Sequence, residues 1–286
     1  MIDGSSIVVA GERVLSRARQ LGAMSELLRL NLTSSESAVA SGGPVVSLTS
    51  FGKRARTVGF TIESIAQGEM RPSRLILWLD EPELLSQPSA MLVRLQRRGV
   101  EVLQTENWGP HKKYYPYVAS QSAFNVPVVT ADDDVLYPTT WLAKLMQRYG
   151  AHSDSVHCYR ARVVNLVGDR LAPYASWNEC GTTAPSHRHF SIGMAGVLLP
   201  PPLLQELQRR GPEFRKDCPR TDDIWLNLHA QRLGAKVRQV HASPDYFMLL
   251  PGTQKGGLLH DNVAGGNDSA LTALYAADDL ARLAQA

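Results

Sequence analysis

"VPVVTADDDVLYP", residues 126–138, joins a short apolar run to three consecutive aspartates, Asp132 to Asp134. The apolar run at 126–131 has the length and the β-branched composition of a buried strand. Like charges gathered at the end of such a strand repel one another and lose solvation, unless something positive neutralises them. A divalent cation would do so, because hard oxygen ligands suit Mg²⁺ or Mn²⁺, and Mg²⁺ is commonly shared between carboxylates and substrate phosphates. The alternative is a solvated turn whose aspartates cap the next helix.

Short apolar runs alternate with helix-period segments around this stretch. We expect strands at 45–49, 74–80 and 100–105, helices near 55–67 and 88–98, and a further helix from about Thr139 to Gly150. Such alternation is typical of an α/β fold, in which a Rossmann-like, mostly parallel central sheet carries helices on both faces.

The alternation weakens after residue 150. The elements expected there are a strand at 156–161, an irregular stretch to about 190, a strand in "SIGMAGVLL" (191–199), helices near 203–210 and 222–233, and a last strand at 235–240. The regular half of the sheet is therefore expected before residue 150.

The composition indicates one globular domain with appendages. The chain has 286 residues, of which 44% are hydrophobic, enough to bury a sizeable core. Thirty Lys and Arg residues against 27 Asp and Glu residues give a net charge of only +3, and the basic residues are scattered. We therefore expect no nucleic-acid partner.

The cysteines and the lengths of the apolar segments bear on the cellular compartment of the protein. Cys158, Cys180 and Cys218 lack the close pairing of a structural zinc site or a disulfide framework, which favours a reducing, cytoplasmic location. No signal peptide begins the chain, and no stretch approaches the roughly 20 apolar residues that span a bilayer. We expect a protein that is neither secreted by that route nor membrane-spanning.

Residues 1–43 read as a helical leader that ends at the break "SGGP" (41–44). Leu21, Met24, Leu27 and Leu28 lie near one face of this helix, and arginines lie elsewhere. We expect the leader to pack against its own domain. The alternative is peripheral membrane association, because a basic amphipathic helix suits a membrane surface.

Three predicted strands end in polar residues. "TSFGKR" (49–54) follows the first strand, "DEPE" (80–83) the second, and the three aspartates the fourth. In an open parallel sheet, ligands bind in the crevice beyond the carboxyl ends of the strands. These segments are therefore the candidate ligand-binding site.

Five stretches carry a family resemblance: "VVSLTSFGKR" (45–54), "TIESI" (61–65), "RLILWLDEPE" (74–83), "VVTADDDVLYPTTWLAKL" (128–145) and "RTDDIWL" (220–226). They resemble glycosyltransferases of the GT-A fold, and are similar to the bacterial family 2 members that build surface polysaccharides and glycolipids. The resemblance covers residues 44–262, and it leaves the leader and a C-terminal helical tail, 263–286, outside. It implies a GT-A type sheet with an irregular acceptor-side region.

The resemblance implies a nucleotide-sugar site at the strand ends. An Asp-x-Asp pair falls on Asp132 and Asp134, with Asp134 chiefly binding the metal and Asp132 binding the ribose or the metal. Asp133, between them, joins the nucleotide-sugar-binding residues. Mn²⁺ or Mg²⁺ is the implied cofactor.

Four further residues would contact the nucleotide. Asp80 matches a position that contacts the base or ribose, and Thr49 and Arg54 match the loop that lines the base pocket. Lys113, in "GPHKKYYPYV", would contact the nucleotide or its phosphates, and the adjacent Lys112 is the alternative.

On the acceptor side, Gly196 in "SIGMAG" matches a glycine whose missing side chain lets the donor sugar approach the backbone. Asp223 in "TDDIWL" matches the catalytic base, and His260 in "GGLLHDN" matches a late histidine that completes the metal site. Taken alone, Thr221, Asp222 and Asp223 also make a good helix start.

The implied activity is metal-dependent, inverting transfer of a sugar from a nucleotide-diphosphate donor, with UDP favoured on family frequency. The acceptor would be a saccharide or a lipid-linked hydroxyl, used in the cytoplasm or at the inner face of the cell membrane. The alternatives are a metal-dependent nucleotidyltransferase or phosphohydrolase, and a non-catalytic GT-A-like binding protein. A nucleotidyltransferase should carry a longer Gly-rich loop than "TSFGKR", and an aspartyl phosphatase would need aspartates where Thr49 and Ser50 stand.

Overall fold

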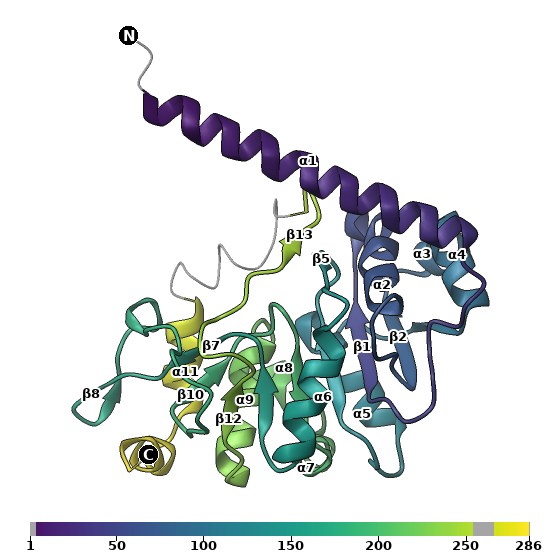
Figure 1. Ribbon diagram of the computed structural model, residues 1–286. Helices are drawn as coiled ribbons and strands as arrows, with labels where there is room; N and C mark the ends of the chain where they lie inside the picture. Colours follow the sequence, from purple (N-terminus) through teal and green to yellow (C-terminus); the bar gives the residue numbers. More distant parts are fainter. Residues whose placement is uncertain (1–3, 254–265, 286) are drawn as a thin grey trace.

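The computed structural model describes residues 4–253 and 266–285. Its central sheet has seven strands in the order β12-β6-β11-β4-β1-β2-β3 (Figure 1). Their bounds are β1 (Val45–Thr49), β2 (Arg74–Leu79), β3 (Val100–Gln104), β4 (Val128–Ala131), β6 (Val156–Cys158), β11 (Val197–Leu199) and β12 (Val237–Gln239). β11 runs antiparallel to β4 and β6, and the other neighbouring pairs of this sheet are parallel. The predicted mostly parallel sheet is confirmed.

Helices cover both faces of the sheet, because its side chains alternate between two apolar cores. On β2, Leu75 and Leu77 enter one core, whereas Ile76 and Trp78 enter the other. The first core also holds side chains of α2 (Val58–Ala66), α4 (Ala90–Arg97) and α6 (Trp141–Ala151). The second holds side chains of α5 (Tyr115–Ser120), α7 (Pro201–Arg210) and α9 (Asp222–Leu233).

The stretch after β6 is irregular, as predicted. It contains the short elements β7 (Ala161–Val163), β8 (Leu166–Val167), β9 (Arg170–Leu171), η3 (Tyr174–Ser176) and β10 (His189–Ser191). The single strand predicted over 191–199 is instead split between β10 and β11. The break lies at Ala195 and Gly196, whose φ angles of 79° and 94° are left-handed and cannot continue a strand.

Short elements connect these strands and helices. They are η1 (Gly52–Arg56), α3 (Pro82–Ser86), η2 (Gly109–Lys113), β5 (Val135–Leu136), η4 (Gly211–Glu213), α8 (Phe214–Asp217) and β13 (Met248–Leu249). η1 and η2 follow β1 and β3, so both lie at the carboxyl edge of the parallel strands. They bring their basic residues to the end of the sheet where the three aspartates follow β4.

The leader forms α1 (Gly4–Thr33), which crosses the top of the view in Figure 1 and meets α2 and α4. Asn31 anchors it, since its buried amide donates to the Glu63 carboxylate at 2.9 Å and to the Met91 carbonyl at 3.2 Å. On the predicted leucine face, Met24 and Leu27 are half-buried, whereas Leu21 and Leu28 are 57% and 41% exposed.

The C-terminal segment forms α11 (Asn267–Leu274) and α12 (Ala277–Ala284), which pack on α9. The buried Asp279 pairs with Arg232 at 2.7 Å and fixes α12 there. Within residues 4–253 and 266–285, no helix is both long enough and apolar enough to cross a bilayer.

Candidate functional site

The strand order reverses at β1 and β4, because β2 and β3 lie on one side of β1 and β4 lies on the other. Doubly wound α/β proteins bind their ligands at the carboxyl edge where the strand order reverses in this way. Ser50, directly after β1, donates from its hydroxyl to Asp133 Oδ2 at 2.5 Å. The ends of β1 and β4 are therefore joined at the place where the sequence predicts the site.

The backbone of the aspartate triad (Asp132–Asp134) is held by neighbouring elements. The Asp132 N–H donates to the Tyr137 hydroxyl at 2.8 Å, and the Asp133 carbonyl accepts from the Thr61 hydroxyl at 3.0 Å. The Asp134 carbonyl accepts from the Leu250 N–H at 2.7 Å. Each aspartate thus has a fixed position before any ligand binds.

Arg54 neutralises two members of the triad. Its Nη2 lies 2.8 Å from Asp133 Oδ1 and forms a second ion pair with Asp134. Burial raises the pKa of Asp133 to about 6, and the Arg54 guanidinium and the Ser50 hydroxyl work in the opposite direction. Burial likewise raises the pKa of Asp134. Arg54 therefore contacts two carboxylates of the triad in this structure, and its expected place in the base pocket stays a prediction.

The two adjacent lysines have different partners. Lys112 forms an ion pair with Asp80 in which both side chains are buried. Lys113 Nζ lies 2.5 Å from Asp132 Oδ1 and 3.7 Å from Asp222 Oδ2. The structure thus brings Lys113, and not Lys112, to the aspartate triad.

The charge of Lys113 is strongly stabilised. Burial disfavours its charged form, but Asp132, Asp222 and Asp223 together raise its pKa well above the usual value. Lys113 is therefore a cation that connects the triad with the start of α9.

Asp223 is held in the first turn of α9. Its Oδ1 accepts a hydrogen bond from the Gly193 N–H at 2.9 Å. Burial and the neighbouring charge of Asp222 raise the pKa of Asp223 to about 7, while Lys113 and the Gly193 N–H act in the opposite direction. The Thr221 side chain makes no capping hydrogen bond, whereas Asp222 and Asp223 both lie in the first turn, where negative charge favours the helix N-terminus.

Asn227 fixes Asp223 relative to β10. Its amide donates to the Asp223 carbonyl at 2.8 Å and to the Ser191 carbonyl at 2.9 Å, and its Oδ1 accepts from the Ser191 N–H at 2.8 Å. Asn227 was not predicted as a site residue, although its place one helical turn after Asp223 puts both on the same face of α9.

Two glycines of "SIGMAG" have different neighbours. A Cβ at Gly193 would lie 2.8 Å from Asp223 Oδ1 and 3.7 Å from Lys113 Nζ. A Cβ at Gly196 would lie 2.6 Å from Cζ2 of the buried Trp141 ring. Gly193, which the sequence analysis missed, therefore opens toward the charged site, and Gly196 makes room for a tryptophan.

The remaining predicted site residues are Thr49 and His260. Thr49 lies at the end of β1 and donates from its hydroxyl to the Trp78 carbonyl at 2.9 Å, which directs it toward β2. His260 lies outside the residues that the structure describes.

The charges of the site fit a bound divalent cation. Among the described residues, Arg54 and Lys113 are the cations that interact with the carboxylates of Asp132, Asp133, Asp134, Asp222 and Asp223. In the described part of the chain, no group of three or more His, Cys, Asp or Glu side chains has the geometry of a complete metal site. A cation here would thus take one or two carboxylates and obtain other ligands from phosphate oxygens, as Mg²⁺ commonly does.

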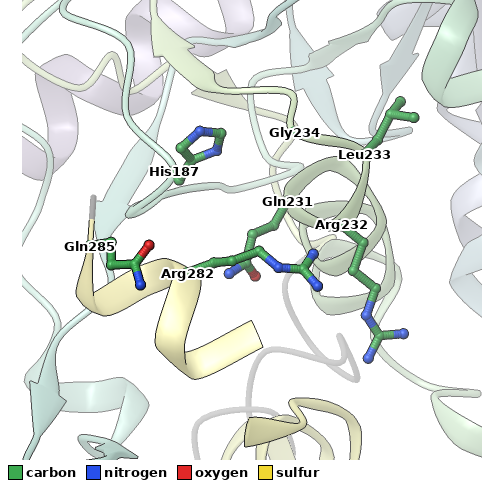
Figure 2. Close-up of a pocket in the computed structure, with 7 residues that line it drawn as sticks. All are labelled: His187, Gln231, Arg232, Leu233, Gly234, Arg282 and Gln285. Atoms are coloured by element: carbon green, nitrogen blue, oxygen red, sulfur yellow. The ribbon is translucent and has the colours of Figure 1, made fainter. Parts of the chain in front are cut away.

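A separate cavity of about 380 Å³ lies at the other end of α9. Figure 2 shows the residues that line it, which are His187, Gln231, Arg232, Leu233, Gly234, Arg282 and Gln285. Because an α-helix rises 1.5 Å per residue, roughly 16 Å of helix separates Gly234 from Asp223. This cavity is not part of the aspartate site.

No protein-family model matches the chain, and no curated protein matches it. Similar solved structures include a mannosyltransferase from Pyrobaculum calidifontis in complex with GDP-Man and Mn²⁺. It is 13% identical, with a TM-score of 0.49, and the match covers 85% of this chain and 68% of that one.

A CMP:2-keto-3-deoxy-manno-octonic acid synthetase complexed with CTP is 11% identical, with a TM-score of 0.45 and coverage of 79% and 98%. A 4-diphosphocytidyl-2C-methyl-D-erythritol synthase from Anaerococcus prevotii is 12% identical, with a TM-score of 0.47 and coverage of 80% and 96%. At these identities the likeness concerns the fold alone.

Proposed function

We propose that the chain is a glycosyltransferase that moves a sugar from a nucleotide-diphosphate donor to an acceptor hydroxyl. The observation that carries the proposal is the position of Asp223, held by the Gly193 N–H beside Lys113 at the ligand-binding edge of the sheet. In this arrangement a carboxylate with a pKa of about 7 lies near Lys113, the cation that would bind a diphosphate.

Asp223 is the proposed general base. A base acts best when its pKa lies near the working pH, because it is then ionised and still basic enough to take a proton. Asp223 would accept the proton of the acceptor hydroxyl as that oxygen attacks the sugar. The Gly193 N–H and Asn227 would orient Asp223 for this transfer.

The donor would bind at the ends of β1, β2 and β4. Lys113 would contact the diphosphate, Asp132 and Asp133 the nucleotide sugar, and Asp80 and Thr49 the base or ribose. Asp134, with Asp132, would hold Mn²⁺ or Mg²⁺, which when bound neutralises the departing diphosphate as a Lewis acid. In this proposal UDP is the favoured nucleotide, and transfer is inverting.

Asp223 also favours glycosyl transfer over nucleotidyl transfer to a sugar phosphate. A hydroxyl nucleophile needs a base to remove its proton, whereas a sugar phosphate that attacks a nucleotide is already ionised at neutral pH. A basic carboxylate beside the donor site thus has a use when the nucleophile is a hydroxyl and none when it is a phosphate. The acceptor we propose is a saccharide or a lipid-linked hydroxyl, used on the cytoplasmic side of the cell.

The test has a binding step and a reaction step. A thermal-shift panel of UDP, GDP, dTDP and CMP with and without Mn²⁺ identifies the nucleotide, since a ligand at 100 times its Kd stabilises a protein by about 2.7 kcal/mol. The chain is then incubated with the matching nucleotide sugars, and nucleoside diphosphate release is measured. Release of pyrophosphate from a nucleoside triphosphate and a sugar phosphate would instead support a nucleotidyltransferase. Binding without any turnover would support a non-catalytic protein.

A further inference from the structure

We propose that Arg54 is an internal counter-cation of the aspartate triad, and that it leaves Asp134 when a divalent cation binds together with the donor diphosphate. The inference rests on the proposed function, since it concerns the same donor site. It adds a residue that couples metal binding to donor binding.

Arg54 occupies the position that a cation would take. Its Nη2 approaches both Asp133 and Asp134, whose side chains are only 6% and 8% exposed. Two buried carboxylates thus share one guanidinium, and Asp133 has the Ser50 hydroxyl as an additional partner. Asp134 has the Thr253 hydroxyl as its own additional partner, so neither carboxylate depends on Arg54 alone.

A metal ion at Asp134 would compete with Arg54. Two cations that contact the same carboxylate repel each other, and this repulsion is stronger in a partly buried site than in water. Mn²⁺ or Mg²⁺ without a nucleotide must therefore either displace Arg54 or bind beside it at a cost. Arg54 accordingly weakens metal binding to the ligand-free protein.

The surroundings of Arg54 allow it to move. It belongs to η1, a single 3₁₀ turn of five residues, and its side chain is 21% exposed. Its Nε is buried and has no hydrogen-bond partner in the described structure, so the guanidinium has unused donor capacity where it now lies. A diphosphate would use that capacity, because guanidinium groups bind phosphate oxygens in a bidentate manner.

The exchange couples the two ligands. The diphosphate offers Arg54 new acceptors, and the departure of Arg54 frees Asp134 for the metal ion. Such coupling is reciprocal, and typical values change each affinity by about 5- to 150-fold. The wild-type chain should therefore bind Mn²⁺ poorly alone and much better with UDP.

The test is Arg54→Gln, with Mn²⁺ binding measured by electron paramagnetic resonance in the absence of nucleotide. The variant should bind Mn²⁺ at least about fivefold more tightly than the wild type, because Asp134 has lost its competitor. UDP should then improve Mn²⁺ affinity less in the variant than in the wild type. Lys53→Gln is the matched control, since Lys53 is the exposed neighbour in η1 and has the same charge. That control should behave like the wild type.

Equal or weaker Mn²⁺ binding by Arg54→Gln would overturn the proposal, as would the absence of Mn²⁺ binding from all three proteins. A second readout covers a variant that folds poorly: in the ¹⁵N-arginine-labelled wild type, Mg²⁺ with UDP should shift the Arg54 side-chain signal, and an unchanged signal would overturn the proposal. Neither readout uses a sugar donor. Absence of sugar transfer would thus contradict the proposed function and leave this inference standing.

Discussion

Asp223 lies in the first turn of α9, where a negative charge favours the helix N-terminus, and its side chain also accepts the Gly193 N–H. These two roles differ in what they cost when the charge is removed. Loss of a charge at a helix start costs about 0.3 to 1 kcal/mol of stability, whereas loss of a general base typically slows a reaction about 10²- to 10⁴-fold. One substitution can therefore separate the two roles.

Asp223→Asn should lower kcat at least about a hundredfold while leaving donor affinity near that of the wild type. Asparagine keeps an acceptor oxygen for the Gly193 N–H, but it cannot accept the proton of a hydroxyl. Turnover, donor Kd and melting temperature should be measured on one preparation. Near-normal turnover would show that Asp223 is not the base, and Asp222 would then be tested first.

Lys113→Ala should weaken binding of a nucleoside diphosphate much more than binding of the corresponding nucleoside. Lys113 is the cation nearest Asp132, so its removal takes away attraction for phosphates while the base and ribose contacts remain. Isothermal titration of UDP and uridine to wild type and variant measures both effects. Equal losses for the two ligands would remove Lys113 from the phosphate site.

At the scale of elements, the turn between β10 and β11 joins the site to the core. Ala195 and Gly196 have left-handed φ angles, and the Ala195 carbonyl accepts a hydrogen bond from Trp141 Nε1 at 2.8 Å. This anchoring fixes the backbone that presents the Gly193 N–H to Asp223. Gly193 in this turn thus borders the site, whereas Gly196 packs against the buried Trp141.

Substitution of these two glycines should have opposite consequences. Gly193→Ala places a methyl group 2.8 Å from Asp223 Oδ1, a side-chain atom that can turn away, so turnover should fall while stability changes little. Gly196→Ala meets the Trp141 ring at an unfavourable φ angle and should lose about 2 kcal/mol of stability, within the usual cost of overpacking. Urea unfolding and turnover of both variants test the pair. The assignments would be contradicted if Gly193→Ala were the less stable variant or Gly196→Ala the less active one.

The sequence was sufficient to predict that the three aspartates follow a buried strand of the central sheet, but not which side chains they contact. Three aspartates after an apolar run predict a charged strand end, because the rule on carboxyl edges depends only on strand direction. Which cation reaches which carboxylate depends on side-chain rotamers and on how η1 and η2 pack, so the Arg54 and Lys112 ion pairs could not be predicted. The role of Gly196 likewise depends on a left-handed φ angle, and that of Gly193 on its distance to Asp223, and neither can be read from the sequence.

At the scale of the whole molecule, the buried acids of the site and the buried histidines change the free energy of unfolding in opposite directions as pH rises. Asp133 and Asp223 have pKa values raised to about 6 and 7, so the free energy of unfolding that they contribute is largest below the pKa of an unfolded aspartate, about 3.9, and falls as pH rises from there to about 6 and 7. His111, His157 and His229 have pKa values lowered by burial to about 4, so their contribution is lost as pH falls toward 4. The measured pH dependence of the wild type mixes both trends.

The difference between the wild type and Asp223→Asn isolates one of these groups. An unfolded aspartate ionises near pH 3.9, whereas folded Asp223 keeps its proton to about pH 7. Between these values the unfolded wild type gains a charge that the folded wild type lacks, so wild-type stability falls relative to the variant. The melting temperature of Asp223→Asn minus that of the wild type should therefore rise steadily from about pH 4 to pH 7 and then level off.

Turnover of the wild type should rise over the upper part of the same range, because only ionised Asp223 can act as a base. Differential scanning fluorimetry of both proteins across this range, with turnover measured in the same buffers, tests the two together. A melting-temperature difference that stays flat would show that Asp223 ionises normally in the folded protein, and the physical reason for assigning it as the base would be lost.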